Sequence, residues 1–197
     1  DCASGEGELQ VKLTSSWKNT IGGDVNDPPI VVGAFYGGGV VFHLFVDGET
    51  GYVAGETHGL IAAVEDQSSN IRWYNGFVTT GATGTAIGTG SANTDAIINV
   101  QGPIETSYAA GLARAYEIGV YADWFLPSKD ELNKMYQNKS TINTTALANS
   151  GSSFSPSWYW SSSEYDLGNA WVQYFYFGEQ FEDWKHFTNS VRAVRAF

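Results

Sequence analysis

The sequence predicts an α+β fold, in which short strands at both ends of the chain flank a helical middle segment. Short apolar runs separated by glycine turns, typical of strands, cover residues 30–77. Helical patterns follow, and alternating apolar and polar residues return from Trp158 to the end. Because strands and helices do not alternate regularly, we expect short antiparallel or mixed sheets with two or three helices, without disulfides.

The first elements are an N-terminal arm and a series of strands. Residues 8–17 alternate apolar and polar side chains and predict a half-buried strand, and the polar residues 18–29 predict a linker or arm. The glycine-punctuated strands are expected at residues 30–35, 40–46, 59–64 and 71–77. We therefore divide the chain into an N-terminal strand and arm at 1–29 and one ligand-binding domain at 30–197.

Helices are expected in the middle of the chain. Three segments have helical spacing: residues 94–100, 107–118 and 129–137. Ser128 is a favourable N-cap and Glu131 stands three residues later, so a capping box marks the start of the third helix. The Ser-, Thr- and Asn-rich residues 138–156 are expected to form a loop before the last strands.

Composition excludes several classes of protein. The chain has 197 residues, 10 Lys and Arg, and a formal net charge of -11, which disfavours a nucleic-acid partner. The single cysteine, Cys2, cannot form an internal disulfide and is expected to be a free thiol. No apolar run approaches the roughly 20 residues of a membrane span. Residues 1–8 lack the regions of a signal peptide, so we expect a chain that is mature or was never exported.

No constellation of residues predicts catalysis, a metal site or a cofactor. The glycine-rich residues 80–90 lack the lysine of a P-loop and the spacing of a dinucleotide-binding motif, so we expect a structural turn. His43, His58 and His186 have no second ligand at a spacing that would bring it to the same face. No G-x-S-x-G motif supports a serine nucleophile. We therefore expect no enzymatic activity, no catalytic residue and no cofactor.

The last 40 residues are unusual because they contain 13 aromatic residues, more than a core can bury. Alternation divides the strand-like residues 170–177 into two faces. One face carries Trp171, Gln173 and Phe175, and the other carries Val172, Tyr174 and Tyr176. We expect the first face to pack on the core. Residues 178–189 follow neither period and mix rings with charges, a composition typical of an interface or paratope.

Acidic residues crowd the same part of the chain. They are Glu164, Asp166, Glu179, Glu182 and Asp183. Lys185 and His186 are the nearby counter-charges. We therefore expect a surface of negative potential and a ligand that is neutral or basic at the contact.

Several longer motifs run through the chain, among them YGGGVVFHL (36–44), DWFLPSKDELNKMY (123–136), YWSSSE (159–164) and VRAVRAF (191–197). In these motifs the sequence from Gly37 onward resembles the Lcl C-terminal-like domain family. The resemblance implies a C-type-lectin-like fold in which irregular C-terminal strands and loops display the binding surface. Calcium-dependent sugar binding is disfavoured, because Trp171 is followed by Val172 and Gln173 instead of the Asn-Asp of calcium-binding lectins.

The tail resembles one subset more closely, the variable proteins of diversity-generating retroelements, in which an error-prone reverse transcriptase diversifies adenine-rich codons. The resemblance implies scaffold roles for Trp171, Gln173, Phe175, Gly178, Gln180, Lys185 and residues 191–195. It implies ligand contacts for Tyr174, Tyr176, Phe177, Glu179, Phe181, Glu182, Asp183, Trp184, His186 and Phe187. We add Val172 from the outward strand face and Asp166 from the acidic group.

These observations predict a non-enzymatic binding module that displays a diversified aromatic surface to a macromolecular ligand, with a protein as the expected partner. Two alternatives remain open. A glycan-binding surface adhesin that works without calcium would stack the rings on sugars, and a structural oligomerisation domain would cover them with another subunit. The expected location is extracellular, on a cell surface or on a phage or virus particle, and the oligomeric state is left open.

Overall fold

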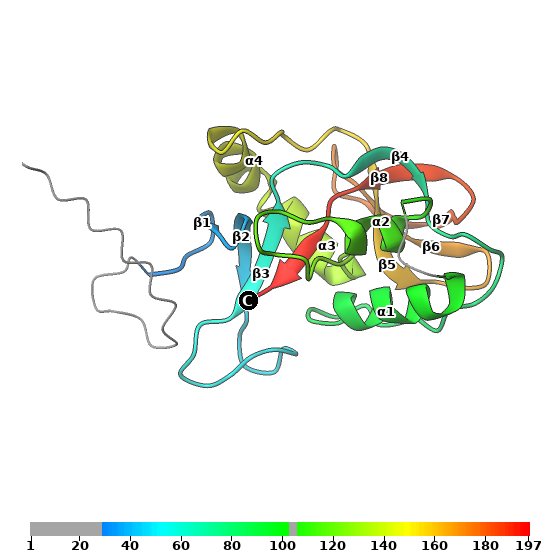
Figure 1. Cartoon of the computed structure of the whole chain (residues 1–197), viewed down its shortest axis with the longest axis horizontal. Coiled ribbons are helices and arrows are strands. Elements are labelled where there is room, and N and C mark those ends of the chain that lie inside the picture. Colours follow the sequence, from blue (N-terminus) through cyan, green and yellow to red (C-terminus); the bar gives the residue numbers. More distant parts are fainter. Residues whose placement is uncertain (1–28, 103–105) are drawn as a thin grey trace, which may run out of the picture.

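The computed structural model describes residues 29–102 and 106–197, which form two sheets and four helices (Figure 1). The predicted strand at 8–17 lies outside the described residues. The first sheet is antiparallel, in the order β1-β2-β3-β9. Its strands are β1 (Phe35–Tyr36), β2 (Gly39–Leu44), β3 (Gly59–Ala63) and β9 (Val194–Ala196).

The second sheet has five strands in the order β4-β8-β5-β6-β7. These are β4 (Ser68–Arg72), β5 (Trp158–Glu164), β6 (Asn169–Tyr174), β7 (Gln180–Trp184) and β8 (Thr188–Val191). β5 and β8 are parallel and meet at Tyr159 and Ser190, whereas the other neighbours are antiparallel. One antiparallel and one mixed sheet confirm the predicted α+β class.

Helices pack on both sheets. They are α1 (Gly90–Gln101), α2 (Ala109–Ala115), α3 (Lys129–Gln137) and α4 (Lys139–Ala148). α1 packs on β5, α4 packs on β2, and α3 lies between the sheets with contacts to β2, β5 and β6. The bounds of α3 confirm the prediction from the capping box: the Ser128 hydroxyl accepts from the Glu131 amide, and the Ser128 amide donates to the Glu131 carboxylate.

The sequence prediction of a loop over residues 138–156 is wrong, because α4 occupies much of this segment. Its Ser, Thr and Asn residues favour caps and turns over helix interiors. Ile142 and Ala146 lie one turn apart, are fully buried, and belong to one core cluster with Phe42 and Phe154. Tertiary packing of this narrow stripe therefore outweighs the weak local propensity.

The C-terminal segment joins the two sheets. β8 belongs to the five-stranded sheet, and β9 pairs with β3 at the edge of the other. Arg192 lies between the two strands, and its Nε donates to Asp66 at 2.7 Å. Arg195 lies in β9, and its Nε donates to Asp123 at 2.7 Å. The hydrogen bonds and charge of Arg195 hold the pKa of Asp123 below its usual value. Both arginines are buried or nearly so, and their ion pairs connect the C-terminal segment to the rest of the core.

Glu131 is a buried carboxylate between α3 and the glycine-rich loop. It accepts backbone hydrogen bonds from Ser128 at 2.7 Å, Gly88 at 2.8 Å and Gly90 at 3.3 Å. Burial raises the pKa of Glu131 to about 7, although these donors favour the ionised form. A Cβ atom at Gly90 would collide with the carboxylate, so the glycine allows this close approach. Residues 80–90 thus include a structural loop whose backbone amides bind the Glu131 carboxylate.

The titration of Glu131 predicts that the protein loses stability as the pH rises from about 4.5 to about 7. The unfolded chain releases this proton first, so unfolding becomes easier across that interval, by about 3 kcal/mol at most. Glu131→Gln cannot ionise. We therefore expect the stability advantage of the wild type over Glu131→Gln to be larger at pH 5 than at pH 7.5, as measured by urea denaturation. An advantage that is equal at both pH values would contradict the assignment.

Candidate functional site

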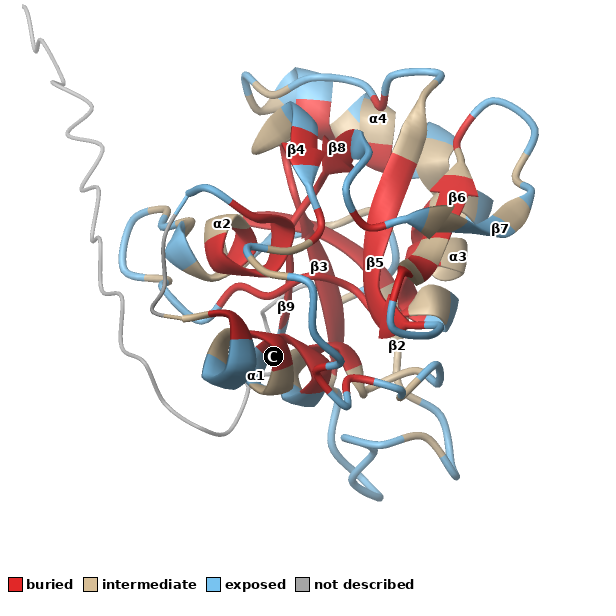
Figure 2. Ribbon diagram, turned by 90° about the vertical axis from the view of Figure 1, so that its right-hand side faces the viewer, coloured by how far each residue is buried: buried red, intermediate tan, exposed pale blue. Residues whose placement is uncertain are grey.

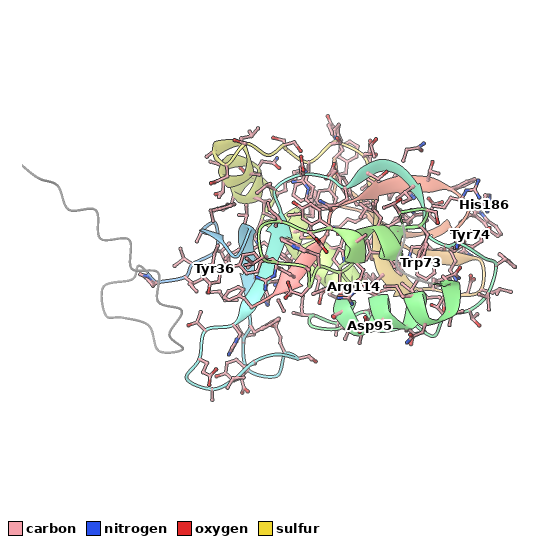
Figure 3. All side chains as sticks on the ribbon, in the orientation of Figure 1. Tyr36, Trp73, Tyr74, Asp95, Arg114 and His186 are labelled. Atoms are coloured by element: carbon pink, nitrogen blue, oxygen red, sulfur yellow. The ribbon has the colours of Figure 1, made fainter. Side chains whose placement is uncertain are left out.

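The rings of the tail gather at one end of the molecule, around β6, β7 and the loops that follow them. Figure 3 places His186 at this end and Tyr36 of β1 at the opposite end. In Figure 2 β5 is mostly buried, whereas β7 is exposed or intermediate. We define the aromatic surface as Trp158, Tyr174, Tyr176, Phe177, Phe181, Trp184, His186 and Phe187.

Five rings of the aromatic surface form one connected group on the face of the sheet that points away from α3. The Trp158 ring stacks on Tyr174, with centroids 4.8 Å apart, and meets the Phe181 ring edge-on at 5.9 Å. Tyr176 and Phe177 extend the group, with centroids 6.2 and 6.0 Å from that of Tyr174. Tyr176, Phe177 and Phe181 expose 57%, 67% and 52% of their surface. These side chains form a continuous aromatic area that is exposed at Tyr176, Phe177 and Phe181.

A second group consists of Trp184, His186 and Phe187, in and after β7. The His186 ring lies 5.9 Å from Trp184 and 4.6 Å from Phe187, measured between centroids. Trp184 and Phe187 are about half exposed, at 51% and 49%. The aromatic surface therefore continues around the edge of the sheet.

The opposite face of the hairpin packs on α3. Gln173 is fully buried and donates to Asn133 Oδ1 at 2.9 Å, and Gln180 donates to the Lys129 carbonyl at 2.9 Å. The Lys129 ammonium lies 3.4 Å from the centroid of the Trp171 ring. These contacts to the first two turns of α3 fix which face of β6 and β7 is turned outward.

The predicted faces of β6 are correct, but two of the side chains are buried to a different extent than expected. Gln173 and Phe175 are buried and Tyr176 is exposed, as expected. Trp171 is half-buried instead of buried, because at this end of the strand α3 covers the ring only with the Lys129 side chain. Tyr174 is also half-buried, because it stacks on Trp158.

The expectation that Val172 lies at the surface is wrong. Val172 is 2% exposed and belongs to the core. It sits in the middle of β6, with Trp160 of β5 and Phe181 of β7 directly opposite it. Val172 and Trp160 belong to the core cluster that also contains Trp73, so this part of the outward face packs on the core and is not exposed. The other predicted contact residues, Asp166 included, are exposed or half-exposed.

Two further expectations about the tail need correction. The strand predicted to run through Phe177 ends at Tyr174, and the turn after it closes at Gly178, which has φ +88° and would bring any Cβ into the Tyr136 ring. Residues 178–189 are not irregular, because they contain β7 and the start of β8. No residue of β7 is fully buried, so this edge strand lacks the apolar alternation that marks a strand in the sequence.

Glu164 and Lys185 form a buried ion pair behind the aromatic surface. Lys185 Nζ lies 2.6 Å from Glu164 Oε1, and the two side chains are 1% and 3% exposed, in the order Lys185 and Glu164. The ammonium also donates to the carbonyl of Asp166 at 2.7 Å, and the carboxylate accepts from the amides of Thr80 and Gly81. The expectation that Glu164 and Lys185 contribute to the surface potential is therefore wrong, because they neutralise each other inside.

The remaining carboxylates of the tail lie at the surface. Asp166 accepts from the amides of Gly168 and Asn169 and so shapes the turn between β5 and β6. Asp183 Oδ2 accepts from Asn189 Nδ2 at 2.9 Å. Glu179 and Glu182 are exposed. The aromatic surface therefore has an acidic rim.

Sequence reasoning did not assign Trp158 and Asn189 to the site. Trp158 lies opposite Tyr174 in the β5-β6 pair, and Asn189 of β8 bonds to Asp183 of β7. The register of the β5-β6 hairpin is the signal that could have found Trp158. No local signal marks Asn189, because β7 and β8 are not neighbours in the sheet.

Two cavities are lined by residues outside the aromatic surface. One of about 550 Å³ is lined by residues including Arg72, Tyr74 and Leu112, and one of about 360 Å³ by residues including Tyr116 and Glu117. Within residues 29–102 and 106–197, no group of three or more His, Cys, Asp or Glu could hold a metal ion. In the same ranges, no helix has the length and apolar character of a membrane span.

Comparison with known proteins identifies the family. The model of the Lcl C-terminal domain matches residues 62–195, which is more than half of the chain. The chain therefore belongs to the Lcl C-terminal domain family, which confirms the resemblance seen in the sequence. No curated protein matches the sequence.

One solved structure shares the arrangement of strands and helices. It is a fimbrial protein from Bacteroides ovatus ATCC 8483, with a TM-score of 0.52 and 15% sequence identity. The match covers 79% of this chain and 43% of the fimbrial protein, so the chain spans less than half of that protein. At this identity the likeness concerns the fold.

The buried ion pair leads to a prediction about stability. Lys185→Met leaves the Glu164 carboxylate buried without its counter-charge, so we expect a loss of about 3–5 kcal/mol in the free energy of unfolding. The double variant Glu164→Gln with Lys185→Met should be more stable than Lys185→Met alone, because the new side-chain amide keeps an acceptor for the amides of the 80–81 loop without a charge. Urea denaturation of the three proteins measures both differences. A single variant as stable as the wild type would show that the pair is not needed.

Proposed function

We propose that this protein is a non-enzymatic binding module whose aromatic surface captures a protein ligand. The observation that carries the proposal is the exposure of five large rings at one end of the domain, each about half exposed or more: Tyr176, Phe177, Phe181, Trp184 and Phe187. Exposed apolar patches of this kind mark interaction sites in soluble domains. Trp and Tyr offer a large contact area at a small entropic cost, as they do in antibody paratopes.

We further propose that the domain has a C-type-lectin-like fold and acts as a variable protein of a diversity-generating retroelement. The burial pattern of the tail supports this. Gln173, Phe175, Lys185 and Arg192, which the resemblance makes scaffold, are buried. The positions that it makes variable are exposed or half-exposed. Substitutions at those positions would change the ligand while leaving the core and its ion pair intact.

The proposed location is outside the cell, on a cell surface or on a phage or virus particle. Similarity in fold to a fimbrial protein supports a surface location. The same similarity keeps a glycan-binding adhesin as a second candidate, since the exposed Tyr176 and Phe177 rings could stack on sugars. A glycan array separates the two candidates, and size-exclusion chromatography tests whether a second subunit covers the rings instead.

The proposal predicts that the rings serve recognition and not folding. Substitution of Tyr176, Phe181 and Trp184 by serine in one triple variant should leave the melting temperature nearly unchanged, because each ring is more than half exposed. Binding to ligands selected from a display library of protein fragments should fall by about 2 kcal/mol or more, which is roughly 30-fold.

A matched control separates this effect from a loss of fold. Phe175→Ala removes a ring that is 2% exposed and should cost about 3–5 kcal/mol of stability. If the triple variant unfolds as readily as Phe175→Ala, the rings belong to the core. If it folds and binds the selected ligands as the wild type does, the aromatic surface is not the binding site.

A further inference from the structure

β7 is the last strand of the five-stranded sheet, so one of its edges has no neighbour in the described structure. Its pairing with β6 is fixed at both ends. The Tyr174 amide donates to the Glu179 carbonyl at 2.9 Å, and the Lys185 amide donates to the Gly168 carbonyl at 2.8 Å. Both bonds belong to one antiparallel register, in which hydrogen-bonded pairs recur at every second residue. Odd-numbered residues of β7 therefore bond to β6, and even-numbered residues point their backbone groups outward.

The outward backbone groups of β7 differ in their partners. Those of Trp184 are used locally: its amide donates to Asp183 Oδ1 at 3.0 Å and its carbonyl accepts from the Phe187 amide at 2.8 Å. Gln180 and Glu182 present outward amides and carbonyls that no described strand pairs. An extended peptide could form up to four main-chain hydrogen bonds with these groups.

Rings flank this edge on both faces of the sheet. Phe181 points to the outer face, where it meets Trp158, and Trp184 points to the other face, where it lies beside Gly168. Each exposes about half of its surface. Side chains alternate between the two faces of a strand. A strand added beside β7 would therefore lay successive side chains against Phe181 on one face and Trp184 on the other.

The charge of the edge favours a basic occupant. Glu179, Glu182 and Asp183 lie on or next to β7 and reach solvent. Lys185 is the one Lys or Arg within residues 179–187, and it pairs with buried Glu164. The Lys129 ammonium lies over Trp171, which pairs with Glu182 in the ladder, so this cation stands near an edge that carries three carboxylates. A second copy of β7 would instead place like charges opposite each other, which destabilises a strand pair.

We infer that an extended, basic segment of the protein ligand binds along the outer edge of β7 and adds a sixth strand to this sheet. The inference rests on the proposed function and specifies how the ligand is held. Main-chain hydrogen bonds to Gln180 and Glu182 supply affinity, as in other cases of strand addition. The carboxylates select Lys and Arg, and the rings of Phe181 and Trp184 hold the alternating side chains.

The probe is a phage-displayed library of short random peptides, selected on the immobilised full chain and counter-selected on the Tyr176, Phe181 and Trp184 triple serine variant. Selected peptides should be enriched in Lys and Arg and depleted of Asp and Glu. N-methylation of alternate backbone amides in a synthetic selected peptide should weaken binding at least about tenfold for one alternate set, because two hydrogen bonds are lost. Methylation of the other set should have little effect.

Variants at Glu182 test the same pairing from the side of the protein. Glu182→Pro removes the outward amide, and an edge strand tolerates proline there because this amide has no partner on β6. Glu182→Ala is the matched control, since it removes the carboxylate but keeps the amide. We expect both variants to melt near the wild-type temperature and Glu182→Pro to bind the peptide at least about tenfold more weakly than Glu182→Ala.

The possible failures are distinguishable. Equal binding by the two Glu182 variants, or no effect of N-methylation, would overturn the added strand, and selected peptides without a basic bias would overturn the charge selection. A dimer in sedimentation that Glu182→Pro dissociates would identify a second copy as the occupant and would overturn the inference. Failure of the proposed function looks different: a folded triple serine variant would then bind the fragment-library ligands as the wild type does.

Discussion

The buried pair of Glu164 and Lys185 constrains the whole ring-bearing end of the molecule. It ties the end of β5, the loop at residues 80–81 and the chain just after β7 to one another. Separating the two charges inside the protein would leave each without compensation, so a shift of the β6-β7 hairpin is costly. The Lys185 ammonium also lies 4.7 Å from the centroid of Trp73, in the core behind the hairpin. The ion pair thus fixes the backbone that carries the exposed rings.

The sequence predicted some elements well because their signals are local. The capping box of Ser128 and Glu131 marks α3, since the two residues satisfy each other's backbone donors without help from the rest of the fold. α4 has no such signal, and its stability comes from the burial of Ile142 and Ala146 against other elements. β7 was not predicted because none of its residues is fully buried. An edge strand that buries neither face carries no periodic pattern.

Within the site, the sequence could predict the direction of a side chain but not its burial. Val172 and Tyr174 point to the same side of β6, yet Val172 is in the core and Tyr174 is half-exposed. The difference lies in their partners: Val172 packs with Trp160 in a core cluster, whereas Tyr174 lies opposite the half-buried Trp158. Likewise, Glu164 and Lys185 stand among surface charges in the sequence, and their pairing depends on a turn that brings β5 and the end of β7 together. Such contacts follow from register, which periodicity alone does not determine.

In the view of Figures 1 and 3, the ring-bearing end, marked by His186, lies at the right, and the C terminus lies in the left half of the domain, beside β3. Residues 188–197 connect these two places, from β8 near the rings to β9 beside β3. Shear between this segment and its neighbours is opposed by the β3-β9 ladder and by the ion pairs of Arg192 with Asp66 and Arg195 with Asp123. Residues 188–197 therefore couple the two sheets, and a displacement of one sheet relative to the other would strain these contacts.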